Sequence, residues 1–398
     1  MRRVLLGLLC ACGTKSAPNP AITPGDGRPT LVWSVEKNGV VNHFIGTCHL
    51  PIPVEDHLPS PEIVEKSRTL YVELDLGTLN PSMIFKKIWD EDLSISSDLG
   101  RVPFAKITRQ VRGTIPAAMV ERSRPWVTAS TIEAMQMTVE GADASEPLDS
   151  KIIALAKANE VPIVPVETFD EQVELMNGLD INFDDDPEDE IESAETRAQM
   201  IALCYRGDTS SVDALLEGDK EENELMLTKR NLAWFPKISE DLSKGGTVVA
   251  VGALHMFGKK GLLKQAEHAG YRVTQLRSTA SEKPLPKLQV FETSEPVLLD
   301  EEEAKQFSQR IATGICADTT MVQPCLESDV AACEERVTKD TLLCLDQIIS
   351  DKAQLADPAI QNELAGCSLA GLTARAMVQG FPDNPVCDAL QQRATPAE

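Results

Sequence analysis

The alternation of hydrophobic and polar positions along the chain predicts strands and helices in an order typical of an α/β protein. Extended runs at 31–35 and 40–45 flank Asn38-Gly39, the kind of residue pair that most strongly indicates a β-hairpin. Four more strands are expected, at 69–76, 161–166, 247–251 and 271–276. The last two flank a helix at 258–270 and form a strand–helix–strand unit of the parallel-sheet kind. We therefore expect a mixed sheet covered by helices.

Helical periodicity accounts for most of the remaining chain. Helical segments are expected at 61–67, at 80–142 with interruptions at Pro103, Pro116 and Pro125, at 150–159, at 196–242 and at 300–398. The acid-rich segment 180–195 lacks the glycine and the terminal glutamate spacing of an EF-hand, so a solvated loop is favoured over a calcium site. Residues 277–298, which are rich in Ser, Pro and Glu, are typical of a linker.

Composition and charge restrict the classes of function. The chain has 398 residues, 42% of them hydrophobic, and its formal net charge is −24. This length suggests more than one domain, and the hydrophobic content is enough for a sizeable core. The excess of acid argues against a nucleic-acid partner, because phosphates attract basic surfaces. No internal apolar run reaches about 18 residues, which excludes a multi-pass membrane protein.

The first residues predict an exported protein. A short basic stretch and an apolar run that is too short to span a bilayer indicate a secretion signal over 1–11. Leu9-Cys10-Ala11-Cys12 resembles a lipobox, so Cys12 is the expected lipid-bearing residue and 12–28 the flexible tether behind it. A plain cleaved signal without a lipid stays open. We expect a lipid-anchored protein in the cell envelope of a Gram-negative bacterium, at the outer membrane or in the periplasm.

The cysteines support export. Six of them crowd into the last hundred residues, namely Cys316, Cys325, Cys333, Cys344, Cys367 and Cys387. An even number in a short exported segment predicts three disulfide bonds, although the pairing stays open. A zinc site is less favoured because the segment has no CxxC pair and no histidine. For Cys48 a buried thiol is the commoner case, and a disulfide with Cys204 is the alternative.

Two segments share the pattern that carries the candidate chemistry. In each, a strand is followed by a glycine and, three residues later, a histidine: Gly46–His49 and Gly252–His255. Ligands of open α/β sheets bind beyond the carboxyl ends of strands, so both histidines are expected at one crevice. Glu73, in the 69–76 run, would be buried there unless it points outward from an edge strand. Two imidazoles and a carboxylate suit a divalent transition metal.

These motifs resemble the TraB/PrgY/GumN family, which includes the Tiki Wnt-directed proteases, from about Leu31 to Leu276. The resemblance is carried by Gly46-Thr47-x-His49, Tyr71-Val72-Glu73-Leu74, Val166-Glu167-Thr168 with Gln172, Arg230-Asn231 with Trp234, and Gly252–His255 leading into Gly258-x-x-Gly261-Leu262-Leu263. It implies a fold similar to that of the erythromycin esterases and the ChaN haem-binding proteins. It also implies a site built from the two histidines and the glutamate, and the Tiki members suggest metal-dependent proteolysis with Mn²⁺ or Co²⁺.

The resulting hypothesis gives each candidate residue a role. His49, His255 and Glu73 would hold a divalent metal (Mn²⁺, Co²⁺ or Zn²⁺), and Glu167 or Glu73 would transfer protons. Arg230 would stabilise negative charge or, alternatively, only form an ion pair with Glu167. Asn231 would fix this arrangement or merely cap backbone.

The domains predicted are a TraB/GumN-like unit at 29–280, a linker at 281–299 and a disulfide-rich, all-α module at 300–398. The expected function is an exported hydrolase that acts on a peptide or another amide or ester. A protein that binds and sequesters a peptide or small ligand without turnover is the main alternative. An interaction protein that docks a partner through its tail is the third.

Overall fold

The computed structural model describes residues 27–50, 52–138, 147–179, 181, 194–216, 220–279, 284–288 and 296–394. The predicted secretion signal, the lipobox Cys12 and nearly all of the tether lie outside the described residues. The acid-rich segment 180–195 lies almost entirely outside them as well.

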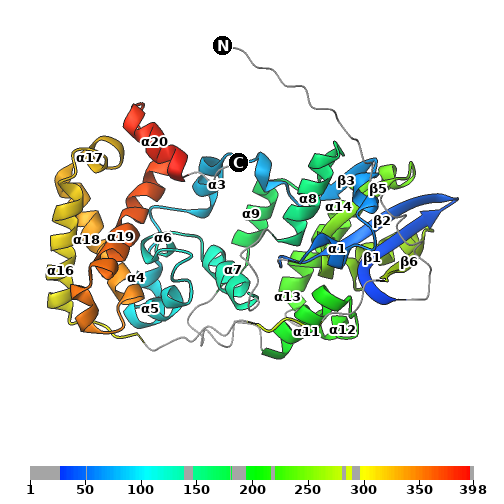
Figure 1. Cartoon of the computed structure of the whole chain (residues 1–398), viewed down its shortest axis with the longest axis horizontal. Coiled ribbons are helices and arrows are strands. Elements are labelled where there is room, and N and C mark those ends of the chain that lie inside the picture. The colour runs from blue at the N-terminus through cyan, green and yellow to red at the C-terminus, as the bar shows by residue number, and fades with distance from the viewer. Residues whose placement is uncertain are drawn as a thin grey trace, which may run out of the picture.

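A six-stranded mixed sheet forms one end of the molecule (Figure 1). Its order is β4-β3-β5-β2-β1-β6. The strands are β1 (Arg28–Lys37), β2 (Val40–Thr47), β3 (Thr69–Val72), β4 (Ile163–Pro165), β5 (Thr247–Gly252) and β6 (Arg272–Ser278). β2, β5, β3 and β4 run parallel, and β1 is antiparallel to both of its neighbours. The β1–β2 hairpin is confirmed, with positive φ at Asn38 (55°) and Gly39 (78°), as a tight primed turn requires.

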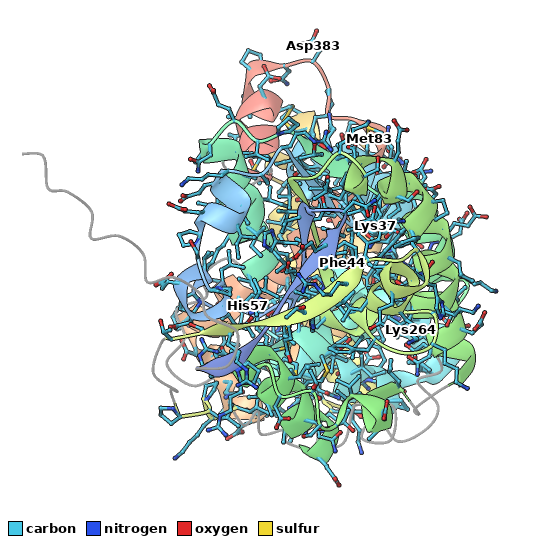
Figure 2. All side chains as sticks on the ribbon, turned by 90° about the vertical axis from the view of Figure 1, so that its right-hand side faces the viewer. Lys37, Phe44, His57, Met83, Lys264 and Asp383 are labelled. Carbon is cyan, nitrogen blue, oxygen red and sulfur yellow. A yellow bond between two sulfur atoms is a disulfide. The ribbon has the colours of Figure 1, made fainter. Side chains whose placement is uncertain are left out.

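Helices form most of the connections between these strands, and several of them pack against the sheet. They are α1 (Val54–His57), α2 (Glu62–Glu65), α8 (Leu148–Ala158), α9 (Phe169–Asn177), α11 (Ala194–Arg206), α12 (Val212–Leu216), α13 (Lys220–Asn223), a π-helix (Glu224–Lys229), α14 (Arg230–Leu242), a 3-10 turn (Ala253–Met256) and α15 (Leu262–His268). α8 packs on β4 and β5, α11 on β1 and α15 on β6. β5 is therefore buried almost from end to end, and Phe44 of β2 lies within the same core (Figure 2).

Three details differ from the sequence prediction. β6 runs in the same direction as β5 but lies at the far edge of the sheet, where it pairs antiparallel with β1. β3 ends at Val72, so Glu73 follows the strand instead of lying within it, and β3 is not an edge strand. α5 runs through Pro103, because a proline in the first turn of a helix removes no helical hydrogen bond.

A second, all-helical body combines two segments that are distant in sequence. The insertion between β3 and α8 contains a 3-10 turn (Leu76–Thr78), α3 (Pro81–Ile88), α4 (Ile95–Leu99), α5 (Arg101–Gln110), α6 (Ala117–Val120) and α7 (Pro125–Gln136). The tail contains α16 (Glu301–Cys316), α17 (Val322–Cys325), α18 (Val330–Ile348), a 3-10 helix (Lys352–Ala356), α19 (Pro358–Gln379) and α20 (Pro385–Ala394). α6 packs against α18 and α19, and α5 packs against α18 (Figure 1). Among all the residues that the structure describes, none of the helices combines the length and the hydropathy of a membrane span.

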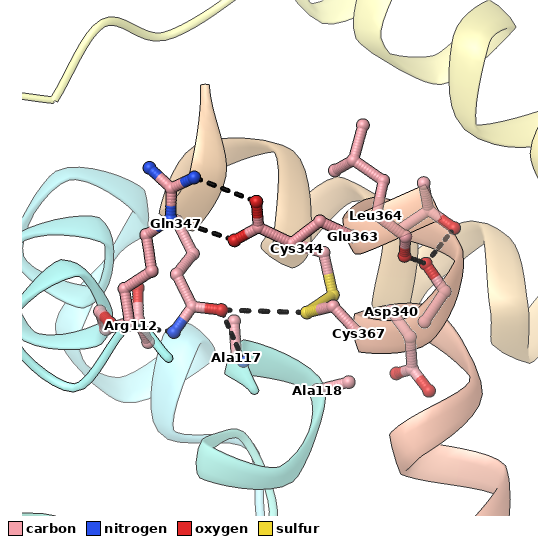
Figure 3. The surroundings of a disulfide bond; sticks show 12 residues. Arg112, Ala117, Ala118, Asp340, Cys344, Gln347, Glu363, Leu364 and Cys367 are labelled. Carbon is pink, nitrogen blue, oxygen red and sulfur yellow. Dashed lines mark hydrogen bonds and ion pairs between the residues drawn. A yellow bond between two sulfur atoms is a disulfide. The ribbon is translucent and has the colours of Figure 1, made fainter. Parts of the chain in front are cut away.

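The two segments share one hydrophobic core. Phe104 and Ile107 of the insertion belong to the same buried cluster as Leu345 and Leu364 of the tail. Figure 3 shows this interface around the Cys344–Cys367 disulfide, where Gln347 of α18 accepts a hydrogen bond from the backbone N–H of Ala117 at 2.9 Å. The domain boundaries predicted above stay a prediction, but the tail does not bury its apolar surface alone.

All eight described cysteines are paired. The bonds are Cys48–Cys204, Cys316–Cys333, Cys325–Cys387 and Cys344–Cys367. The three disulfides predicted for the tail are thus confirmed, and their pairing is resolved. The expectation of a free buried thiol at Cys48 is wrong, because its sulfur is bonded to Cys204 of α11.

Candidate functional site

The candidate residues follow the ends of the four parallel strands. β2 leads into His49, β3 into Glu73, β4 into Glu167 and β5 into His255. Because parallel strands present their carboxyl ends at the same edge, the sheet gathers these residues on one side, where open α/β sheets bind ligands. Arg230 comes to this edge from the first turn of α14.

The two Gly-x-x-His turns are in close contact. A Cβ added to Gly46 would lie 3.0 Å from Cα of Ala253, in the other turn. The N–H of Gly252 donates a 2.7 Å hydrogen bond to Oε1 of Glu73. A Cβ added to Gly252 would lie only 3.1 Å from the same oxygen. The glycines are therefore needed for backbone to approach both the partner turn and the carboxylate.

Arg230 lies at the centre of the site. Its Nε donates to Oε2 of Glu167 at 3.1 Å, and its Nη2 donates to Oε1 of Glu167 and, at 2.6 Å, to Oε2 of Glu73. Its Nη1 donates to the carbonyl of Met226 and to Nε2 of His255, both at 3.3 Å. All five N–H groups of the guanidinium thus have partners. Burial lowers the pKa of Arg230, but the two carboxylates outweigh burial and raise it, so the side chain stays charged.

Glu73 is an ionised carboxylate at the more open side of this cluster. Its side chain is 18% exposed, whereas those of Arg230 and Glu167 are 7% and 6% exposed. Burial by itself would raise the pKa of Glu73, but His255, Arg230 and the Gly252 N–H together lower it to about 2. Near neutral pH Glu73 therefore carries a negative charge and no proton.

Glu167 holds Arg230 in place. Besides the two bonds from Arg230, its oxygens accept hydrogen bonds from Nε1 of Trp234 at 3.1 Å and Nε2 of Gln172 at 3.2 Å. Burial raises the pKa of Glu167, and the bonds from Arg230 oppose this change. The Trp234 ring also lies against both the guanidinium and His255, with centroid distances of 4.6 Å to Cζ and 4.4 Å between the rings. The sequence prediction gave Trp234 and Gln172 no role.

His255 is neutral and its ring is oriented by Asn231. Nδ1 of His255 lies 2.8 Å from Oδ1 of Asn231, while Nδ2 of Asn231 donates to the His255 carbonyl at 3.2 Å. The second bond fixes which amide atom faces the ring, so Nδ1 carries the proton and Nε2 keeps its lone pair. That Nε2 lies 3.7 Å from Oε1 of Glu73. Burial lowers the pKa of His255 to about 4, although Glu73 opposes this change.

His49 lies beside the buried cluster and is not part of its hydrogen-bond network. Its side chain is 78% exposed, and its Nδ1 contacts Oδ2 of Asp149 at 3.0 Å. This hydrogen bond raises the pKa of His49, while solvent around the exposed ring limits the effect. His49 is close enough to lower the pKa of both Glu73 and His255. Asp149, in the first turn of α8, had no role in the sequence prediction.

The donor chemistry fits a divalent cation, although the donors are not gathered around one point. Each imidazole has its Nδ1 bonded to an acceptor oxygen, which leaves Nε2 for a metal, and Glu73 supplies an ionised carboxylate. Across the ranges described above, no three His, Cys, Asp or Glu side chains form a group that could hold a metal ion. A cation bound at His255 would also replace the contact from Arg230. The metal set of His49, His255 and Glu73 therefore stays a prediction.

The molecule is thus an α/β protein with a buried cluster of charged and polar side chains at the carboxyl edge of its parallel strands. The family profile of the TraB/PrgY/gumN family matches residues 31–275, and the chain belongs to this family. The match ends before the disulfide-bonded tail.

Two curated relatives are similar to this chain over part of its length. The uncharacterized protein YbaP of Shigella flexneri is 24% identical over 242 residues, which are 56% of this chain and 86% of that protein. YbaP of Escherichia coli strain K12 is 24% identical over 241 residues, which are 55% of this chain and 85% of that protein. No solved structure matches the chain. The likeness to erythromycin esterases and ChaN proteins therefore stays a prediction.

Proposed function

We propose that this chain is a hydrolase that cleaves an amide or ester bond, most simply in a peptide. The observation that supports this most is the cluster of Glu73, Arg230 and His255 at the carboxyl edge of the sheet, with a neutral imidazole next to a fixed cation and a fixed anion. A structural ion pair needs no neutral imidazole that is held in one orientation with its acceptor nitrogen facing the pair. A hydrolytic site does, because water must lose a proton as it attacks.

The proposed metal ligands are His49, His255 and Glu73, through Nε2 of each ring and the carboxylate. A divalent cation such as Mn²⁺, Co²⁺ or Zn²⁺ would polarise a carbonyl and activate water there. His255, held by Asn231, keeps an acceptor nitrogen at the site at neutral pH. Glu73 holds a negative charge and attracts cations. Arg230 supplies the positive charge that would stabilise an oxyanion, once one of its N–H groups leaves its present partner.

The proposed location is the bacterial envelope, with a lipid on Cys12 as the membrane contact. The paired cysteines support export, because disulfides persist mainly in oxidising compartments. The substrate would then be a peptide or a small molecule outside the cytoplasm.

The test is hydrolysis of a peptide library by the purified full chain, combined with metal analysis. We expect turnover that is lost in EDTA and restored by Mn²⁺, Co²⁺ or Zn²⁺. His255→Ala should lower kcat/KM by about 100-fold or more, because a positioned base or ligand contributes at least that much. His268→Ala, which changes an exposed histidine at the end of α15, is the matched control and should not. Undiminished turnover in a His49→Ala/His255→Ala double variant would remove the mechanism.

A binding protein without turnover is the second candidate. This alternative is favoured by the hydrogen bonds of Arg230. All five of its N–H groups bond to the protein itself, so none is available to stabilise an oxyanion without rearrangement. Under this alternative the library yields a ligand whose affinity is the same with and without EDTA, and no product forms.

A further inference from the structure

The start of α8 places an unassigned carboxylate next to His49. The backbone N–H of Leu148 donates to the carbonyl of Leu50 at 2.9 Å, and Nζ of Lys151 donates to the carbonyl of Ile52 at 3.3 Å. These two bonds join the first turn of α8 to the loop that follows His49. Asp149 lies between the two bonded residues, so its position relative to His49 is set by the backbone and not by a flexible surface contact.

The two oxygens of Asp149 have different surroundings. Oδ2 lies 3.0 Å from Nδ1 of His49, whereas Oδ1 is buried and has no hydrogen-bond partner in the part of the chain that the structure describes. A buried carboxylate oxygen without a partner is costly. It is tolerated where the group has a task or where a further ligand completes its bonding.

The two site imidazoles are held in the same way by different elements. Asn231 of α14 bonds Nδ1 of His255, and Asp149 of α8 bonds Nδ1 of His49. The His255 ring is also enclosed by Trp234, but the His49 ring is mostly in solvent. Because few atoms pack against the exposed His49 ring, the hydrogen bond to Asp149 restrains a ring that packing does not hold.

We propose that Asp149 is the positioning residue of His49: its Oδ2 accepts the Nδ1–H and holds the ring in one orientation, so that Nε2 is the ring nitrogen that a ligand would use. This inference rests on the proposed function, in which Nε2 of His49 binds a metal. Asp149 itself touches neither substrate nor metal and acts through His49. Carboxylates that hold a ligating histidine in this way raise the basicity of the ring and fix its tautomer.

The test compares Asp149→Asn with the wild-type full chain, with Co²⁺ as the probe and ring ¹⁵N resonances as a metal-free readout. Asn keeps the shape but replaces the carboxylate, and losing such a partner costs about 10–100-fold in metal affinity. We expect a loss of Co²⁺ affinity in this range. In the metal-free protein we expect the His49 ring resonances to shift, because the ring loses the carboxylate that accepts its Nδ1–H. Asp241→Asn is the matched control, because Asp241 bonds Tyr71 and not a histidine. It should change neither readout.

Each outcome decides the inference. Unchanged ring resonances in Asp149→Asn overturn it, whatever happens to Co²⁺ binding. The Co²⁺ absorption spectrum of Asp149→Asn could instead show that the metal has lost a ligand while the His49 ring resonances stay unchanged. Asp149 would then itself be a metal ligand, and the inference would be wrong. If the wild type binds no Co²⁺ while the ring resonances shift in the variant, the metal part of the proposed function fails and the positioning role stands.

Discussion

At the scale of single residues, Arg230 decides what kind of site this is. Two carboxylates and one guanidinium are buried together, so the group carries a net negative charge when both acids are ionised. Removing one partner of a buried ion pair typically costs about 3–5 kcal/mol, because the remaining charge loses its compensation. The three charged groups therefore stabilise one another. The chemistry of the cluster depends on Glu73, its most exposed member, and on His255, whose Nε2 would have to give up Arg230 to make a further contact.

The histidines at this edge are also expected to make folding sensitive to acid. Nε2 of His57 lies 2.9 Å from the carbonyl of Gly46, in the turn that leads to His49. Burial lowers the pKa of His57 to about 4, compared with 6.5 in the unfolded chain. Between these two pKa values the unfolded chain binds a proton at His57 that the folded protein does not bind. The neutral His57 therefore makes its full contribution to the free energy of unfolding above pH 6.5, and this contribution is lost as the pH falls through 4.

The predicted result is a loss of about 3 kcal/mol in the free energy of unfolding between pH 7 and pH 4 from His57 alone. His57→Gln keeps a donor for the Gly46 carbonyl but has no group that titrates in this range. Between pH 7 and pH 4 the variant should therefore lose about 3 kcal/mol less of its free energy of unfolding than the wild type does. Urea denaturation at a series of pH values measures the difference. His268→Gln, at an exposed position, should follow the wild type. If the free energy of unfolding of His57→Gln depended on pH in the same way as that of the wild type, the prediction of a buried, neutral His57 would be wrong.

At the scale of elements, local patterns predict the strands better than the partners of the helices. The hairpin follows from alternation and from Asn38-Gly39. The Gly-x-x-His pattern after two strands is why the amino-acid sequence alone predicts His49 and His255 at one edge, whereas it predicts Glu73 within its strand. It does not predict Asp149 at that edge, because a carboxylate in the first turn of a helix usually serves that helix alone. The contact of Asp149 with His49 depends on how α8 packs, which no local pattern encodes.

The packing of the insertion against the tail was likewise beyond the sequence pattern. Both segments show ordinary helical periodicity, which reveals that a face is buried but not against what. Gln347 of α18 shows how specific the contact is. Its amide accepts from the N–H of Ala117 at 2.9 Å and donates to the carbonyls of Thr108 and Ile115 at 2.7 and 3.0 Å. One side chain of the tail thus bonds three backbone groups of the insertion.

Gln347→Leu should therefore weaken this interface. Leucine has similar bulk but leaves the Ala117 N–H buried without a partner, at a cost of about 1–3 kcal/mol. We expect faster amide hydrogen exchange at Ala117 and along α6, measured by mass spectrometry, with exchange in β5 unchanged. Gln361→Leu is the control, because Gln361 bonds the Leu355 carbonyl at an exposed position within the tail. If the amides of α6 exchanged equally slowly in both variants, the side-chain amide of Gln347 would not be what holds the two segments together.

At the scale of the whole molecule, the helical body is attached at the site itself. The insertion leaves the sheet after Glu73 and returns shortly before Asp149. It also contacts α9, the helix that follows Glu167, through a 3.2 Å ion pair between Lys87 and Asp170. A second contact is a 2.9 Å hydrogen bond from Trp126 to Asn177. The helical body is therefore joined to the sheet both by the chain on either side of the insertion and by these contacts with α9.

This attachment predicts the effect of removing residues 296–398. The tail covers a set of buried apolar side chains in the insertion, namely Ile95, Phe104, Ile107, Val111 and Val120. Exposing each costs about 1.5–3 kcal/mol, so together they represent a large part of the roughly 5–15 kcal/mol that stabilises a typical domain. We expect a protease to cut the shortened chain within 80–136 under conditions in which it does not cut the full chain there. Full protection of the insertion in the shortened chain would mean that the sheet domain alone supports these helices and that the shared core is dispensable.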